Sequence, residues 1–313
     1  MRRRLLLGAA LALPALRAQA ARRLDLIVGA RPGTPVDTAA RAFAPFLERH
    51  LPQTRLRVVS VPGEAGAAAL RTLAGAGEGA LGWLATPTLM ARMIERPPLR
   101  PLLAGLVLVG AVQKEPIAFV AGPGGPPDVL RLMLAGDARA APLATPAAGS
   151  PAHLAALRLQ AMSGHRLDII AFPTATAARL AALAGNVGLA ALGLTDAIAQ
   201  LRAGQLGGIA VASRQREPAW AELPPLADSG VALAASIWRG LAAPAGTSQA
   251  LLADLRGALR AVVADPEFRD HASATGFIAS TLDGSAWQTQ ADREGAVLAA
   301  LWADSPWRSE GHG

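Results

Sequence analysis

The sequence predicts an α/β protein in which short apolar strands alternate with helices. Three observations lead to this fold class. Apolar runs of strand length recur along the chain, stretches with helical spacing of apolar residues follow them, and Gly- and Pro-rich turns separate the two. Because domains usually hold 100–200 residues, a chain of 313 residues is expected to form about two of them. The alternation favours mainly parallel strands.

The first strand, turn and helix form the unit on which the functional argument rests. Leu24–Val28 is a short apolar strand, and Gly29–Gly33 is a turn. Thr34 is the expected N-cap of a helix with Pro35 at its first position, and Asp37 completes a capping pattern. Such a helix start carries free N–H groups and can bind an anion. The apolar positions with helical spacing are Val36, Ala40, Phe43 and Leu47.

The later elements follow from the same signals. Pro45 lies inside the first helix, so we expect this helix to kink or to end at Ala44. Strands are predicted at 55–61, 80–84, 106–112, 117–120, 143–145, 168–171, 187–191, 208–211 and 236–241. Helices are predicted at 67–76, 128–135, 176–184 and 195–203, and others begin near Thr88, Ser150, Thr247 or Ser248, Asp265 and Ser285.

Two places mark where the chain changes domain. Gly122–Pro127 is the segment richest in Pro and Gly, which is typical of a crossing between domains. The apolar segment 236–241 is expected to return the chain to the first domain. We therefore predict domain 1 at 21–122 plus 235–313, and domain 2 at 123–234.

The N-terminus has the pattern of an export signal. Arg2–Arg4 is followed by the apolar segment Leu5–Leu16, and Ala18–Ala20 fits a cleavage site, so residues 1–20 are the predicted signal peptide, cleaved after Ala20. The paired arginines fit twin-arginine export, and the general route stays equally open. Cleavage would lower the formal charge from +7 to +3, with scattered arginines. We therefore expect a periplasmic protein that does not bind nucleic acid.

Motifs for catalysis, cofactors and metals are missing from the sequence. There is no cysteine, and the five histidines lack metal-ligand spacing. Gly77–Gly82 matches G-x-G-x-x-G, but it lies between a helix and a strand, the reverse of the dinucleotide-binding context. We expect a turn there, no cofactor, no metal, and a protein that is not an enzyme.

Fragments along the mature chain match, in order, the motifs of one protein family. The resemblance covers about residues 22–303. Its clearest parts are Gly149–Ser150 with His153–Ala155 ("GSxxHLA") and Trp238 with Gly240–Leu241 and Ala243–Thr247 ("WFGLxAPAGTP"). The other fragments are Leu26–Val28 with Pro32–Gly33, Asp37 and Ala40–Ala42; Val59–Gly66; Asp168–Ile169 with Pro173; Gly185 with Val187; Ala203–Leu206 with Ile209–Val211; and Asp265–Phe268. In these fragments the chain resembles the receptors of tripartite tricarboxylate transporters, the Bug or TctC-like family.

The resemblance implies the two-domain, type II-like periplasmic-binding-protein fold, with each sheet flanked by helices and a ligand cleft between the domains. It implies a monomeric receptor that captures a small-molecule carboxylate and delivers it to the membrane subunits of a tripartite transporter. Three alternatives stay open: a sensory protein that presents its ligand to a membrane sensor, an exported serine hydrolase that uses Ser150, and a degenerate family member that binds no ligand.

The expected ligand site combines the family loops with strand ends. The family holds a carboxylate with the loop after the first strand and with the "GS" loop of the second domain. Thr34 and Pro35 stand where the family usually has glycines, and Arg31 and Arg239 stand at usually apolar positions, so either arginine is expected to take a second carboxylate. The expected ligand-binding residues are Arg31, Gly33, Thr34, Asp37, Thr86, Gly149, Ser150, Thr174, Thr195, Asp196 and Arg239.

Overall fold

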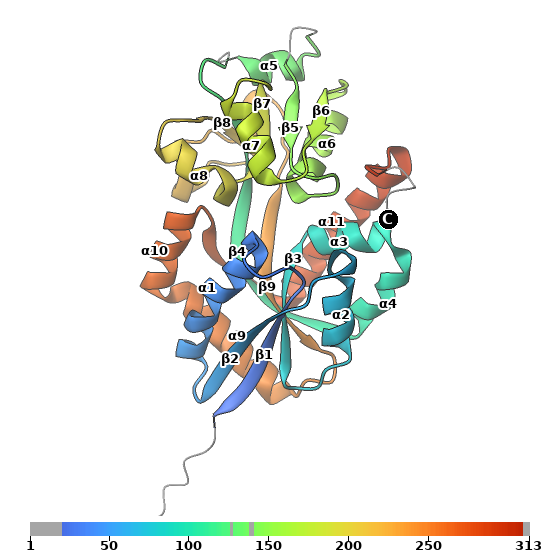
Figure 1. Ribbon diagram of the computed structural model, residues 1–313, viewed down its shortest axis with the longest axis vertical. Coiled ribbons are helices and arrows are strands. Elements are labelled where there is room, and N and C mark those ends of the chain that lie inside the picture. The colour runs from blue at the N-terminus through green and yellow to red at the C-terminus, as the bar shows by residue number, and fades with distance from the viewer. Residues whose placement is uncertain (1–20, 126–127, 138–140, 309–313) are drawn as a thin grey trace, which may run out of the picture.

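The computed structural model describes residues 21–125, 128–137 and 141–308. The predicted signal peptide and residues 126–127 of the predicted crossing lie outside this described part of the chain. The described elements form two lobes joined by the long strands β4 and β9 (Figure 1). The α/β fold with two domains is confirmed.

The first lobe contains the sheet order β2-β1-β3-β9-β4, and β10 pairs with β4. β1 pairs in parallel with β2 and β3, whereas β9 is antiparallel to both β3 and β4. Its strands are β1 (Arg22–Val28), β2 (Thr54–Ser60), β3 (Ala80–Thr86), β4 (Leu106–Ala121, up to Pro116), β9 (Ser236–Pro244) and β10 (Ile278–Asp283). Its helices are α1 (Pro35–His50), α2 (Ala67–Ala74), α3 (Thr88–Glu95), α4 (Arg100–Ala104), α9 (Gln249–Ala264), α10 (Pro266–Thr275) and α11 (Gly284–Asp304), with short 3₁₀ turns at Glu64–Gly66 and Pro97–Leu99.

Helices cover both faces of this sheet. α1, α9 and α10 pack on one face, where Phe43 stacks on Trp83 with 4.7 Å between ring centroids. α2 and α11 pack on the other face, where Trp287 is fully buried. Because both faces are covered, the central strands are apolar throughout, as a buried sheet requires.

The second lobe is built on the distal part of β4. From Ile117 onward this strand pairs antiparallel with β7 and β8, while β5 pairs in parallel with β6 and β7. Its remaining strands are β5 (Leu143–Thr145), β6 (Ile169–Ala171), β7 (Leu189–Gly193) and β8 (Gly207–Val211). Its helices are α5 (Val129–Leu134), α6 (Pro151–Ser163), α7 (Ala175–Leu183) and α8 (Leu194–Arg202), with 3₁₀ turns at Pro218–Trp220 and Leu226–Ser229.

The prediction of two strands at 106–112 and 117–120 is wrong, because β4 is a single strand of 16 residues. Pro116, which could have interrupted it, lies opposite Ser236 at the end of the pairing with β9. The chain thus passes between the lobes inside β4, before it reaches Gly122. The domain limits proposed from the sequence stay a prediction.

Helix α1 does not end at Ala44 but continues through Pro45 to His50. A proline inside a helix costs about 3 kcal/mol. Burial of Phe43 and Leu47, both fully inside the core, offsets this cost because each such side chain contributes about 2 kcal/mol. Strand β10 was not predicted from the sequence.

Polar contacts join the lobes on both sides of the connecting strands. Arg202 of α8 donates hydrogen bonds to the carbonyl oxygens of Ser273 (2.7 Å) and Ala274 (2.8 Å) in α10. On the other side, Arg158 of α6 lies 3.8 Å from Glu294 of α11. Within the described ranges, no helix combines the length and apolar character that crossing a membrane would need.

Candidate functional site

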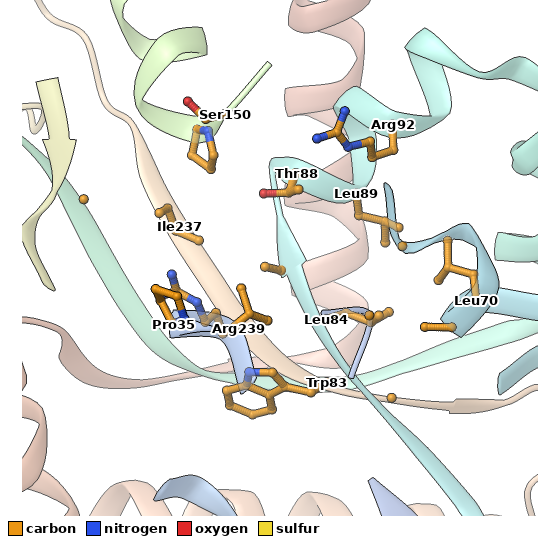
Figure 2. Close-up of a pocket in the computed structure, with 18 of the residues that line it drawn as sticks. Pro35, Leu70, Trp83, Leu84, Thr88, Leu89, Arg92, Ser150, Ile237 and Arg239 are labelled. Atoms are coloured by element: carbon orange, nitrogen blue, oxygen red, sulfur yellow. The ribbon is translucent and has the colours of Figure 1, made fainter. Parts of the chain in front are cut away.

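A cavity of about 320 Å³ lies between the two lobes. Figure 2 shows its lining: Pro35, Ile237 and Arg239 lie at one end, and Leu70, Leu84 and Leu89 lie at the other. Residues of the first lobe form most of the wall. The second lobe contributes Pro146, Ser150–Ala152, Ala175, Gly193, Thr195 and Asp196.

The loop before α1 is held by Asp37. The carboxylate of this buried residue accepts hydrogen bonds from the backbone N–H of Gly33 (2.9 Å), from Arg41 (2.8 Å) and from the hydroxyl of Ser60 (2.6 Å). These bonds, above all that from Arg41, hold the pKa of Asp37 well below its usual range. Asp37 therefore fixes the conformation of the loop but does not line the cavity, whereas Pro35 does.

Thr34 is the N-cap of α1, but its side chain does not cap the helix. Its hydroxyl donates instead to the carbonyl oxygen of Arg31, at 2.7 Å. Neither Thr34 nor Arg31 lines the cavity, and both are positioned by the tight turn that Gly33 makes at φ +77°. A backbone with this φ favours glycine, in agreement with the turn predicted at Gly29–Gly33.

The loop before α6 is the contribution of the second lobe. Ser150 is the N-cap, and its hydroxyl oxygen accepts from the backbone N–H of His153 at 3.2 Å, as predicted. The Nδ1 atom of His153 accepts from the N–H of Gly149 at 3.3 Å. Burial, with a smaller contribution from Arg308, lowers the pKa of His153 to about 4, so the ring is neutral at pH 7.

This loop is fixed against the first lobe by the residues that follow α11. Trp307 donates through Nε1 to the carboxylate of Glu95 at 2.8 Å, and Arg308 donates to the carbonyl oxygen of Ala148 at 3.0 Å. Gly149 is packed so closely against Glu95 and Trp307 that a Cβ would lie 2.5 Å from the Glu95 Oε1 atom. Gly149 therefore lies buried beside the cavity without lining it, and it allows the backbone to pack closely against Glu95 and Trp307.

A buried ion pair lies below the cavity. Glu115 of β4 is fully buried, pairs with Arg239 of β9, and accepts from both the N–H (3.1 Å) and the hydroxyl (2.5 Å) of Thr195. Arg239, Thr195 and Asp196 line the cavity, and they also line a second cavity of about 520 Å³ together with Gly33.

Burial raises the pKa of Asp196 to about 6, and the neighbouring charge of Glu115 adds to this shift. Because the folded pKa lies above the unfolded value of 3.8, the stability that this proton contributes is fully present below pH 3.8 and is lost as the pH rises through 6.

We therefore expect Asp196→Asn to raise Tm relative to the natural protein above pH 6, with the difference shrinking towards pH 4. The neutral amide removes a charge that is costly to bury, and this advantage disappears once the aspartate is protonated. Tm measured from pH 4 to 8 for both proteins checks this. A difference that stays constant across the range would contradict it.

The remaining expected residues lie elsewhere. Thr86 is fully buried and accepts from Nε1 of Trp287 at 3.0 Å, which is a contact of the protein core. Thr174 is exposed and caps α7 by accepting from the N–H of Ala177 at 3.1 Å. Of the expected residues, the cavity brings together Ser150, Thr195, Asp196 and Arg239.

Thr88 and Arg92 of α3 both line the cavity and were not among the ligand-binding residues expected from the sequence. Thr88 begins this helix and Arg92 lies one turn further along it, so spacing alone could have placed them together. Among the described residues, no group of His, Asp and Glu side chains is arranged to hold a metal ion.

A two-domain α/β fold with a cavity between lobes that are joined by long strands is typical of solute-binding proteins of the periplasmic type. The comparisons agree with this class. The chain belongs to the family described as "Tripartite tricarboxylate transporter family receptor", whose sequence model matches residues 138–295.

Individual relatives are distant in sequence. The UPF0065 protein in the clcB-clcD intergenic region of Pseudomonas knackmussii is 27% identical over 157 residues, which are 48% of this chain and 92% of that protein. A TctC solute-binding protein from Polaromonas, solved without ligand, has a TM-score of 0.76 and 25% identity over 90% of this chain and 98% of its own. MatC from Rhodopseudomonas palustris, solved with bound malate, has a TM-score of 0.72 and 20% identity over 89% of this chain and 98% of its own.

Proposed function

We propose that this protein captures a small carboxylate in the cavity between its lobes and delivers it to the membrane subunits of a tripartite transporter. The observation that carries the proposal is the cavity itself, which two lobes enclose and which arginine and hydroxyl side chains line. Structural neighbours with bound malate or adipate support a carboxylate as the ligand.

The mechanism follows from the two-lobe geometry. A ligand that touches cavity residues of the first lobe and Ser150 of the second makes its full set of contacts only when the lobes are closed. Ligand binding then shifts the equilibrium towards the closed form, which is the form that a membrane partner would recognise. No chemical step is part of this function.

Cellular context forms part of the same proposal. The protein is exported after removal of residues 1–20, acts in the periplasm as a monomer, and divides into domains at about 21–122 plus 235–313 and at 123–234. Uptake of the ligand by cells that lack the protein tests delivery. Unimpaired uptake, with loss of a ligand-dependent sensory response, would favour the sensor alternative.

Binding is tested by a thermal-shift screen of the purified protein against mono-, di- and tricarboxylates and their neutral amides. A ligand at a hundred times its Kd stabilises the folded state by about 2.7 kcal/mol, which raises Tm by several degrees. We expect a shift with carboxylates that is lost with the amides. No shift with any acid would contradict the proposal.

The serine hydrolase alternative finds no support in the local geometry. The Ser150 hydroxyl oxygen accepts from the His153 backbone, and the Nδ1 atom of His153 faces the Gly149 N–H. A nucleophilic serine requires a base that accepts its proton. Ester or amide hydrolysis that disappears in Ser150→Ala would nevertheless reinstate this alternative.

A further inference from the structure

The cavity has two chemically different ends. One end is apolar and is formed by Leu70 and Leu73 of α2, Leu84 of β3, Leu89 of α3 and Leu99. Figure 2 shows Leu70, Leu84 and Leu89 together on one side, away from Ser150, Ile237 and Arg239. An apolar wall of this kind stabilises a hydrocarbon group, by about 0.8 kcal/mol for each methylene removed from water.

Arg92 of α3 also lines the cavity, and Figure 2 shows its guanidinium extending toward the side on which Ser150 lies. Its guanidinium pairs with Glu95 at 2.5 Å, and only about a fifth of the side chain is exposed. Glu95 also lies 3.3 Å from Arg308, so two guanidinium groups share a single carboxylate. The part of the cavity next to Arg92 therefore has an excess of positive charge, which a bound anion would balance.

Two hydroxyl groups lie on the same side of the cavity as Arg92. Figure 2 shows Thr88 and Ser150, one from each lobe, on this side, opposite Trp83. The Ser150 oxygen accepts from His153, which leaves its O–H able to donate to a ligand oxygen. Hydrogen bonds to a carboxylate are stronger than those between neutral groups.

Arg239 has different surroundings: one of its terminal nitrogens pairs with Glu115, whereas its buried Nε atom has no hydrogen-bond partner among the described residues. Its partner Glu115 is fully buried, and Asp196 lines the cavity beside it. A second carboxylate placed at Arg239 would therefore meet two acidic side chains. This arrangement disfavours the binding of dicarboxylates and tricarboxylates, because their additional negative charge would lie next to Arg239 and its two acidic neighbours.

We propose that the ligand is a monocarboxylate with an apolar body, held with its carboxylate at Arg92, Thr88 and Ser150 and its hydrocarbon part against the leucine side chains. This inference rests on the proposed function and assigns the ligand class of the same site. Arg92 is thereby the specificity-determining residue, and Arg239 is a structural partner of Glu115.

The first test is a ligand series on the natural protein. Kd is measured by calorimetry for acetate, butanoate, hexanoate and phenylacetate, with hexanamide, adipate and citrate as comparisons. We expect affinity to rise about threefold to fourfold for each added methylene. Hexanamide and citrate should bind at least tenfold more weakly than hexanoate.

The second test is Arg92→Gln, which should weaken hexanoate binding about 10- to 100-fold because it removes a charge-assisted contact. Trp307 and Arg308 still contact Glu95 in this variant, so its Tm without ligand should stay close to that of the natural protein. Arg92→Lys, which keeps the charge, should lose less affinity. Arg71→Gln is the matched control, because Arg71 of α2 pairs with Glu64 of the preceding 3₁₀ turn and does not line the cavity.

The outcomes separate this inference from the proposed function. Tighter binding of adipate or citrate than of hexanoate, or equal affinity of Arg92→Gln and the natural protein, would overturn the inference and leave a carboxylate receptor. The absence of binding by every acid would overturn both.

Discussion

Arg239→Met is expected to lower the free energy of unfolding by about 3–5 kcal/mol, because it leaves the carboxylate of Glu115 buried without a counter-charge. Glu115 has no exposed surface, and its other partner is neutral Thr195. Thr195 cannot balance the charge of Glu115. The free-energy cost of burying an unpaired ion far exceeds the cost of breaking an ion pair on the surface. Urea unfolding measures the change.

Two further variants isolate the cause. Arg71→Met removes an arginine from an exposed pair with Glu64 and should cost less than about 1 kcal/mol. The double variant Arg239→Met/Glu115→Gln removes both charges and should recover more than half of the loss. If Arg239→Met lowered the free energy of unfolding by no more than Arg71→Met does, the ion pair would not stabilise the strands that join the lobes.

Gly149→Ala is expected to destabilise the protein by about 2–5 kcal/mol, from two costs that add. Its φ of +76° is unfavourable for any residue with a Cβ, and the new methyl group would lie 2.5 Å from Glu95 and 3.0 Å from Trp307. The loop before α6 would have to move away from the first lobe, which should also weaken ligand binding through Ser150.

Gly164→Ala separates the two costs. Gly164 has a similar φ of +71°, but no atom lies within 4 Å of the position of a Cβ. It should therefore cost only about 1–2 kcal/mol. Thermal and urea unfolding of both variants measure the difference, and equal losses would show that contact with Glu95 and Trp307 contributes nothing.

Local signals in the sequence located most of the helix starts. Ser150 caps α6 as predicted, because its hydroxyl oxygen accepts from the backbone N–H of His153 and Pro151 has no N–H that needs a partner. The capping pattern at Thr34 was only partly right. Asp37 bonds Gly33, Arg41 and Ser60, and Ser60 comes from a neighbouring strand 23 residues further along.

Side chains that interact over long sequence distances were not predictable in this way. Thr86 has the sequence position of a strand-end ligand residue, but Trp287 of α11, 201 residues away, covers it. Arg239 was singled out as a ligand arginine, and only the folded chain shows that Glu115, 124 residues away, is its partner. Helical spacing places Arg92 on the same face as Thr88, but only the folded chain shows that this face lines the cavity.

The sequence by itself determined the α/β class, the family, most strand and helix positions and the loops that approach the cavity between the lobes. These features depend on hydrophobic periodicity, capping and turn residues, which act within a few positions along the chain. The tertiary structure decided which charges are already paired, where Glu115 neutralises Arg239 and where Arg92 and Arg308 share Glu95. Electrostatic pairing depends on distance in space and on burial, and neither can be read from the order of residues.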